Sequence, residues 1–331
     1  MLYDVHVHVA QLGSHEATDR FVMHRPNLYV RMFLRRLGLS AAVLANPEIN
    51  ALIRRQLVAR VSQCSIDRFV LLAMDGAFDL QGQGVPDQTR WVVDNEFVAD
   101  LARAHPSLLF GASIHPYRKN ALDALRRVAD RGACLVKWIP SAQRIRLDDA
   151  RCTSFYELLA HLGVPLLVHT GNEHASWSGP NRWNDPALLR YPLNRGVKVI
   201  AAHCGARMYL HERCYFKSFC RMALEHEHLY GDLAAFGIPT RIAAIRTLQR
   251  NPDLTAKVVY GSDFPAFTMA RWFVLAIGPK AVREILYEAN PLQQSYLLMK
   301  RMGVPDEVFC RAGKLLRLPA GCERAEVAHE A

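Results

Sequence analysis

Short, almost wholly apolar runs alternate with amphipathic segments along most of this chain, and this alternation limits the folds open to it. Apolar runs of this kind are typical of strands that are buried on both faces of a parallel sheet. Eight of them occur, at residues 2–8, 68–74, 108–114, 134–139, 164–169, 197–203, 229–234 and 257–260.

Helical patterns separate the runs. One helix face before the fifth run consists of Phe155, Leu158, Leu159 and Leu162. Eight strand–helix repeats predict an α/β fold, a (β/α)8 TIM barrel. We expect extra helices after the first strand, within residues 9–67, and at the C-terminus, within residues 270–318. Residues 1–318 would then form one barrel domain, and residues 319–331 a frayed tail.

Composition restricts the class of protein and its partners. The chain has 331 residues, and 41 Lys and Arg against 31 Asp and Glu give a net charge of +10. The basic residues are dispersed, which favours a small anionic substrate over nucleic acid. No apolar run is long enough to span a membrane. Eight cysteines without a CxxC pair, and an N-terminus without a secretory leader, predict a cytoplasmic protein with free thiols.

Polar side chains gather where the predicted strands end. His6 and His8 are two residues apart on the first strand, so both face the same side of it. Imidazole nitrogens and carboxylate oxygens suit a borderline divalent ion such as Zn²⁺. The carboxyl ends of barrel strands meet at one face, which predicts a metal site there. The other residues at these ends are Lys137, His169, His203 and Asp263.

Four short motifs resemble the amidohydrolase superfamily, and most closely its amidohydrolase-related branch of metal-dependent hydrolases and decarboxylases. The motifs are DVHVH at residues 4–8, VHTG at 168–171, AHCG at 202–205 and YGSDFP at 260–265. The resemblance runs from residue 2 to about residue 318. It implies one divalent ion, with zinc as the first expectation.

The resemblance also implies roles for individual residues. The residues that match the metal ligands are His6, His8, His169 and Asp263. Asp263 would in addition shuttle a proton, and His203 would act in catalysis beside the metal. General acid–base help of this kind is what an attacking water requires.

Lys137 has two readings. In two-metal members of the superfamily a lysine at this position is carboxylated and bridges two ions, and His203 would then be a ligand of the second ion. Alternatively, at a one-metal site, Lys137 holds an anionic substrate or simply faces the barrel mouth. The sequence that directly follows Lys137 departs from the usual form of the branch, because Trp138 and Ile139 stand where a Leu-His pair is common.

The loops after the fifth and sixth strands supply candidates for substrate binding. Glu173, His174 and Trp177 follow the fifth strand and Arg207 follows the sixth, so these side chains would overhang the metal. An ordinary polar loop held in place by its tryptophans explains the first three residues about equally well.

The leading function is a metal-dependent hydrolase that directs an activated water at an amide, lactone or ester of a small anionic substrate. The alternative is a non-oxidative decarboxylase of an unsaturated or aromatic acid at the same site. A barrel that binds a ligand without catalysis is a remote third possibility. A homo-oligomer remains open, and we expect no nucleic-acid or membrane partner.

Overall fold

Eight parallel strands form one sheet in the computed structural model, which describes residues 1–12, 28–89, 91–174 and 179–318. The strands pair in chain order, each with the next. They are β1 (Tyr3–His8), β2 (Arg68–Leu72), β3 (Leu108–Ala112), β4 (Leu135–Trp138), β5 (Leu166–His169), β6 (Val199–Ala202), β7 (Leu229–Asp232) and β8 (Val258–Val259).

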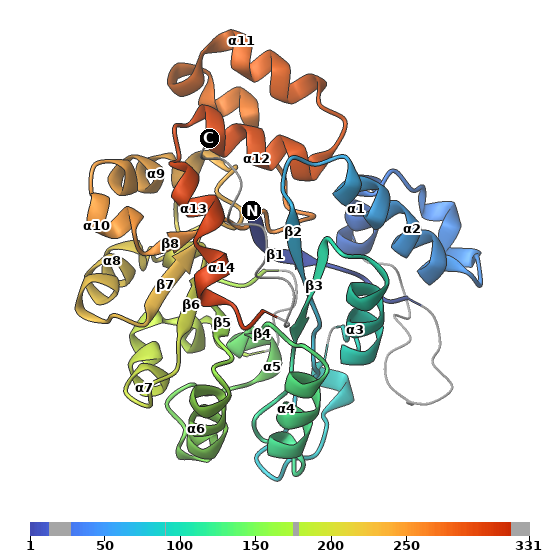
Figure 1. Ribbon diagram of the computed structural model, residues 1–331, viewed down its shortest axis with the longest axis vertical. Coiled ribbons are helices and arrows are strands. Elements are labelled where there is room, and N and C mark those ends of the chain that lie inside the picture. The colour runs from blue at the N-terminus through green and yellow to red at the C-terminus, as the bar shows by residue number, and fades with distance from the viewer. Residues whose placement is uncertain (13–27, 90, 175–178, 319–331) are drawn as a thin grey trace, which may run out of the picture.

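Backbone contacts between the first and last strands close the sheet. The Val5 amide donates to the carbonyl of Tyr260 at 3.1 Å, and Val7 forms a parallel bridge with Phe264. Helices lie around the outside of the strands (Figure 1). The predicted (β/α)8 barrel is therefore confirmed, with all eight predicted strands in place.

Helices lie between successive strands and after the last one, and the longer helices bury one apolar face, as their spacing predicts. Those up to β6 are α1 (Leu28–Arg36), α2 (Ile49–Ser62), α3 (Asn95–Ala104), α4 (Ala121–Asp130), α5 (Pro140–Gln143), α6 (Thr153–Leu162) and α7 (Arg190–Leu193). Those after β6 are α8 (Phe216–Glu225), α9 (Ile242–Gln249), α10 (Pro252–Thr255), α11 (Val274–Tyr287), α12 (Pro291–Arg301), α13 (Asp306–Cys310) and α14 (Ala312–Leu315).

Two apolar clusters make up the core. The larger one fills the space between the strands and the surrounding helices. The smaller one fills the barrel interior with residues such as Val5 and Leu135, and it includes Ala312 and Leu315 of α14. Helix α14 crosses in front of the strands in Figure 1. It thus covers the end of the barrel where the strands begin, and leaves the opposite end for a site.

The observed strands are shorter than the predicted ones, and the sixth shows why. It was expected to reach His203 but ends at Ala202, because His203 and Cys204 adopt left-handed backbone angles, with φ of 63° and 51°. Such angles cannot continue a strand. The expected helices after β1 and near the C-terminus are present, whereas the predicted tail, 319–331, lies outside the described residues.

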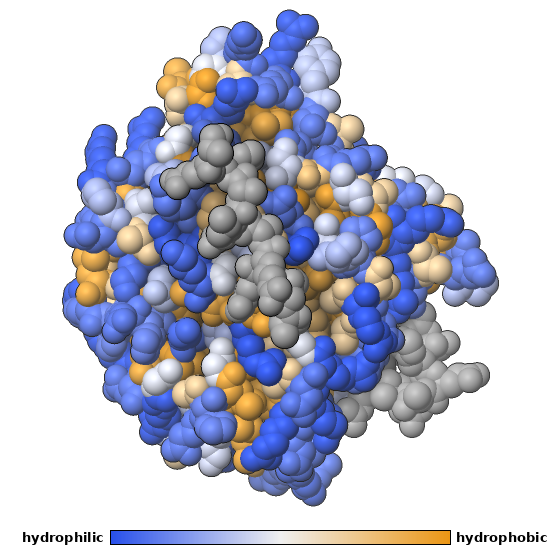
Figure 2. All heavy atoms as spheres, in the orientation of Figure 1, coloured by the Kyte–Doolittle hydropathy of each residue, from blue (hydrophilic) through white to orange (hydrophobic). Residues whose placement is uncertain are grey.

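The visible outer surface is mostly hydrophilic, with scattered apolar patches (Figure 2). No helix within the described part of the chain is long and apolar enough to cross a membrane.

Candidate metal centre

Three side-chain atoms, two from β1 and one from the turn after β8, lie almost equally far apart. His6 Nε2 is 3.2 Å from His8 Nε2 and 3.2 Å from Asp263 Oδ1, and His8 Nε2 is 3.3 Å from the same oxygen. Ligands held at zinc–nitrogen distances of about 2.0–2.1 Å and at tetrahedral angles lie about 3.3 Å from one another. The spacing and the donor set therefore fit one divalent ion.

His6 is oriented by Asp232 at the end of β7. Its Nδ1 lies 2.8 Å from Asp232 Oδ2, and both side chains are buried. A carboxylate only accepts hydrogen bonds, so Nδ1 carries the proton and Nε2 keeps its lone pair for the ion. Burial raises the pKa of Asp232, but His6, His203 and Lys137 together outweigh burial and bring the pKa to about 2. Asp232 is thus a buried anion that fixes the tautomer of His6, a candidate ligand.

Asp263 reaches the cluster because the chain turns sharply after β8. Its φ is 60°, and its amide donates to the His6 carbonyl at 2.9 Å. One residue earlier, the Ser262 amide donates to Asp4 Oδ1 at 2.9 Å, which ties the turn to β1. Burial opposes the charge on Asp263, but the histidines around it hold its pKa well below the usual value. The carboxylate is therefore charged and able to bind a cation.

Lys137 stands beside the three atoms. Its Nζ is 3.3 Å from His6 Nε2, and its side chain is buried at the end of β4. Burial lowers the pKa of Lys137 to about 8, although Asp232 and Asp263 act in the opposite direction. A buried lysine whose pKa lies close to neutral pH can hold an anion when it is protonated, and can react with carbon dioxide when it is not. Both readings of Lys137 therefore remain open.

His169 and His203 form the other side of the site. His169 Nδ1 is 3.2 Å from His203 Nε2 and 3.5 Å from Glu173 Oε2. Burial lowers the pKa of His169 to about 4 and that of His203 well below its usual value, so both rings are neutral. Among the described residues, His169 Nε2 is buried and has no hydrogen-bond partner. A buried lone pair without a partner is costly, and a metal ion would satisfy it.

The predicted substrate-binding residues differ in their burial and in their hydrogen-bond partners. Glu173 is buried beside His169, whereas His174 is exposed and its Nε2 lies 2.6 Å from Glu212 Oε1. The Arg207 guanidinium donates to the Leu210 carbonyl in its own loop. Trp177 lies outside the described residues. The roles of these residues, like those of the ligands, remain predictions.

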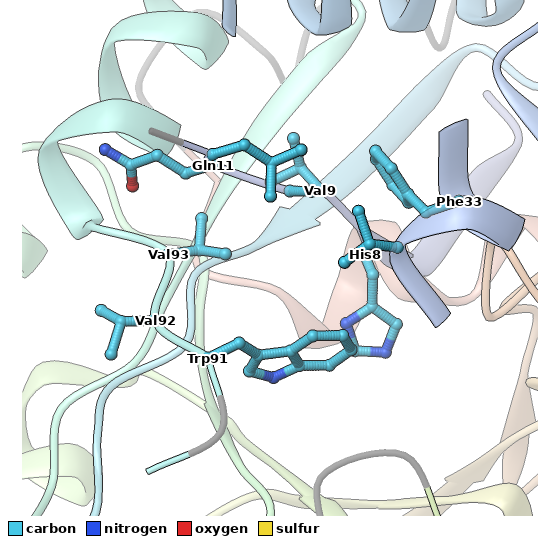
Figure 3. A pocket seen from close by; sticks show the side chains of 10 residues that line it. His8, Val9, Gln11, Phe33, Trp91, Val92 and Val93 are labelled. Carbon is cyan, nitrogen blue, oxygen red and sulfur yellow. The ribbon is translucent and has the colours of Figure 1, made fainter. Parts of the chain in front are cut away.

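An apolar pocket beside His8 was not anticipated from the sequence. About 370 Å³ of space, part of which is open solvent, lies between its walls, and Phe33, Trp91 and Val93 are among the residues that line it. Figure 3 shows the Trp91 indole next to the His8 imidazole, with ring centroids 6.5 Å apart. Its walls come from β1, α1 and the loop after β2. No spacing pattern in the sequence links these three segments.

Comparisons with known proteins agree with the barrel. The family model described as Amidohydrolase matches residues 3–292, and no curated protein matches the chain. An uncharacterised TIM-barrel protein from Bordetella bronchiseptica has a similar structure, at 18% identity and a TM-score of 0.58, covering 94% of this chain and 99% of that one.

Two further similar structures carry the names of different reactions. A protein assigned as a 2-pyrone-4,6-dicarboxylic acid hydrolase, from Pseudomonas putida, is 15% identical, with a TM-score of 0.52 and coverage of 91% and 97%. The 5-carboxyvanillate decarboxylase of Sphingomonas paucimobilis is 14% identical, with a TM-score of 0.50 and coverage of 92% and 99%. At these identities the likeness concerns the fold.

Proposed function

Because this chain belongs to the amidohydrolase family, we propose that it is a metal-dependent hydrolase acting on an amide, lactone or ester of a small anionic substrate. The observation that carries this proposal is the triangle of His6 Nε2, His8 Nε2 and Asp263 Oδ1, with sides of 3.2–3.3 Å. The partnerless Nε2 of His169 supports a fourth ligand from β5. Two or three imidazoles and one carboxylate favour zinc.

A divalent ion bound to these residues would supply positive charge that makes water more acidic and polarises a carbonyl group. The chain's own groups would then manage protons and orientation. Asp263, charged and beside the ion, would accept the proton of the attacking water through its carboxylate. His203 is neutral, and its Nε2 would pass a proton between water and the leaving group. Buried Lys137 would hold the carboxylate of the substrate.

The apolar pocket beside His8 would receive the part of the substrate that does not react. Its walls bury apolar surface next to a charged centre, which suits a molecule with a carboxylate at one end and a ring or short chain at the other. The hydrolase and the decarboxylase found by structural comparison are both named for substrates that carry carboxyl groups.

Decarboxylation of such an acid is the alternative function. The buried Lys137 favours it to the same degree as hydrolysis, because the ammonium group would orient the departing carboxylate. In that reaction the carbon–carbon bond to the carboxylate breaks, carbon dioxide leaves, and a proton takes its place on carbon.

The experiment that separates these functions is a screen of small carboxylic acids, lactones and amides that records carbon dioxide and acid release in parallel. Chelated protein and the variant with both His6→Ala and His8→Ala serve as controls. Acid release that disappears on chelation and returns with zinc supports hydrolysis, and carbon dioxide release with the same dependence supports decarboxylation. Turnover that survives in the double variant would refute a metal-dependent function.

A further inference from the structure

A buried arginine joins the two loops beside the candidate metal centre. Arg241 lies at the end of the short helix η7 (Pro239–Arg241), and 4% of its surface is exposed. Its Nη2 donates to the Ala206 carbonyl at 3.1 Å, after β6, and its Nη1 donates to the Ala234 carbonyl at 2.8 Å, after β7. A third bond runs from Nε to the Arg207 carbonyl at 3.3 Å. The guanidinium therefore fixes both loops.

The Ala234 carbonyl has a second donor, which is His203. His203 Nδ1 lies 3.0 Å from this oxygen and 3.4 Å from Arg241 Nη1. A carbonyl oxygen has two lone pairs and donates nothing, so it accepts one N–H from each residue. A bare Nδ1 would place its lone pair 3.0 Å from this oxygen, which can only accept, whereas the contact with Arg241 is longer, so the geometry assigns the ring proton of His203 to Nδ1. Its Nε2 is left as an acceptor and faces His169 Nδ1 at 3.2 Å.

The backbone beside this carbonyl is in a conformation that its surroundings must maintain. Ala235, the next residue, has a φ of 55°, in the left-handed region that non-glycine residues rarely adopt. The bond from Arg241 to the Ala234 carbonyl reaches directly into this turn. The Phe236 ring lies below the guanidinium, 5.5 Å from its central carbon.

We propose that Arg241 is a positioning residue that acts through the Ala234 carbonyl to fix the orientation and tautomer of His203, so that Nε2 of His203 is the acceptor presented to the metal centre. The inference rests on the proposed role of His203 in proton transfer, since only a bare Nε2 can take up a proton there. Without Arg241, the carbonyl would lose one of its restraints and the ring could turn or exchange its tautomer.

A merely structural role for Arg241 would predict something different. An arginine that only braces the two loops would lower stability when replaced, and would leave the folded molecules with the same His203 tautomer. The tautomer is therefore the decisive readout, and it is measured in metal-free protein without substrate. The result therefore does not depend on whether the proposed metal-dependent function is correct, and failure of one proposal can be told from failure of the other.

The experiment compares Arg241→Met with the matched control Arg36→Met. Arg36 is also largely buried, donates to a backbone carbonyl, that of Ala266 at 3.1 Å, and lies over a phenylalanine ring, that of Phe267. Nitrogen-15 spectra of histidine-labelled, metal-free protein report the protonated nitrogen of each ring. We expect His203 to be protonated at Nδ1 in the wild type and in the control, and to become a mixture of tautomers in Arg241→Met.

Once a substrate is found, the same variants give a second readout. Loss of a partner that orients a group at a metal site typically costs about 10- to 100-fold in activity. We expect kcat of Arg241→Met to fall by such a factor, per metal-loaded chain and with KM unchanged, while Arg36→Met keeps the wild-type kcat. An unchanged tautomer in Arg241→Met, or an unchanged kcat, would overturn the proposal.

If Arg241→Met does not fold, Arg241→Gln replaces it. The amide nitrogen of glutamine corresponds in position to Nε of Arg241, so it can keep the bond to the Arg207 carbonyl but does not reach the Ala234 carbonyl, and the mixture of tautomers is expected here as well. A wild-type tautomer in Arg241→Gln would overturn the proposal.

Discussion

At the scale of single residues, Asp232 connects the two sides of the candidate metal centre. Its Oδ2 accepts the Nδ1 proton of His6, and its Oδ1 accepts the backbone amides of His203 and Ala234, at 2.7 and 3.0 Å. One buried carboxylate thus fixes the tautomer of His6 with one oxygen and the loop that carries His203 with the other. An asparagine at this position would still accept the amides of His203 and Ala234, but its NH₂ group would donate a hydrogen bond to His6 Nδ1 instead of accepting one from it.

Asp232→Asn should therefore weaken metal binding while the barrel remains folded. The amide would donate to His6 Nδ1, which moves the ring proton to Nε2 and blocks the ligand atom. We expect affinity for zinc to fall by about 10- to 100-fold, measured by competition with a chelator. As a control, Asp149→Asn removes a carboxylate that pairs with Arg151 away from the centre, and should leave the affinity unchanged. Equal affinities in the wild type and Asp232→Asn would contradict this role.

Lys137→Ala separates a one-ion site from a two-ion site. If Lys137 holds substrate, the variant should lose substrate affinity or turnover and still bind about one zinc ion per chain. Elemental analysis of both proteins measures this directly. Two ions in the wild type that fall to one in the variant, and are partly restored by short carboxylic acids, would instead support a carboxylated lysine that bridges the ions.

At the scale of elements, the sequence predicted the candidate residues that lie at strand ends but not the loop contacts that hold them in place. The eight strands were recognisable by their apolar runs, and His6, His8 and Asp263 follow from where β1 and β8 end. Arg241 could not be recognised, because an arginine at the start of an amphipathic helix is usually exposed. Its burial arises from contacts with the loop after β6, which no local pattern encodes.

The chain passes close to β1 where it leaves β8, at Gly261. A Cβ atom added to Gly261 would lie 2.9 Å from the Cβ of His6. Gly261→Ala should therefore displace His6, lower the free energy of unfolding by roughly 1–3 kcal/mol and weaken zinc binding. Gly163→Ala offers the contrast, because Gly163 has a φ of 64° but open space around it.

Gly163→Ala should cost about 1–2 kcal/mol in backbone strain and leave zinc affinity unchanged. Chemical denaturation and zinc titration of both variants make the comparison. Wild-type zinc affinity in Gly261→Ala would show that contact between these strands does not position the ligand.

The pocket formed by β1, α1 and the loop after β2 is expected to bind the apolar part of the substrate. Trp91→Leu removes an aromatic wall, and a loss of about 1 kcal/mol or somewhat more corresponds to a rise in KM of roughly fivefold to tenfold. We expect kcat to change little. The matched control is Trp272→Leu, since Trp272 is 64% exposed on the short helix η8 (Ala270–Phe273). Equal KM values in the two variants would remove the pocket from the substrate site.

At the scale of the whole molecule, the barrel brings together groups that are far apart in the sequence. His6 and Asp263 are separated by most of the chain, yet the closure of β1 against β8 places their ligand atoms 3.2 Å apart. Helix α14 fills the opposite end of the barrel, so the polar groups share one end and the apolar residues the other. The fold thus accommodates a charged centre without exposing its core to water.

The most direct test of this account is the location of zinc in a crystal of the wild-type chain, measured by anomalous scattering at the zinc absorption edge. The account predicts one peak about 2.0–2.2 Å from His6 Nε2, His8 Nε2 and an Asp263 carboxylate oxygen. A zinc-loaded crystal with no peak among these three side chains, or with its peak elsewhere in the molecule, would contradict it.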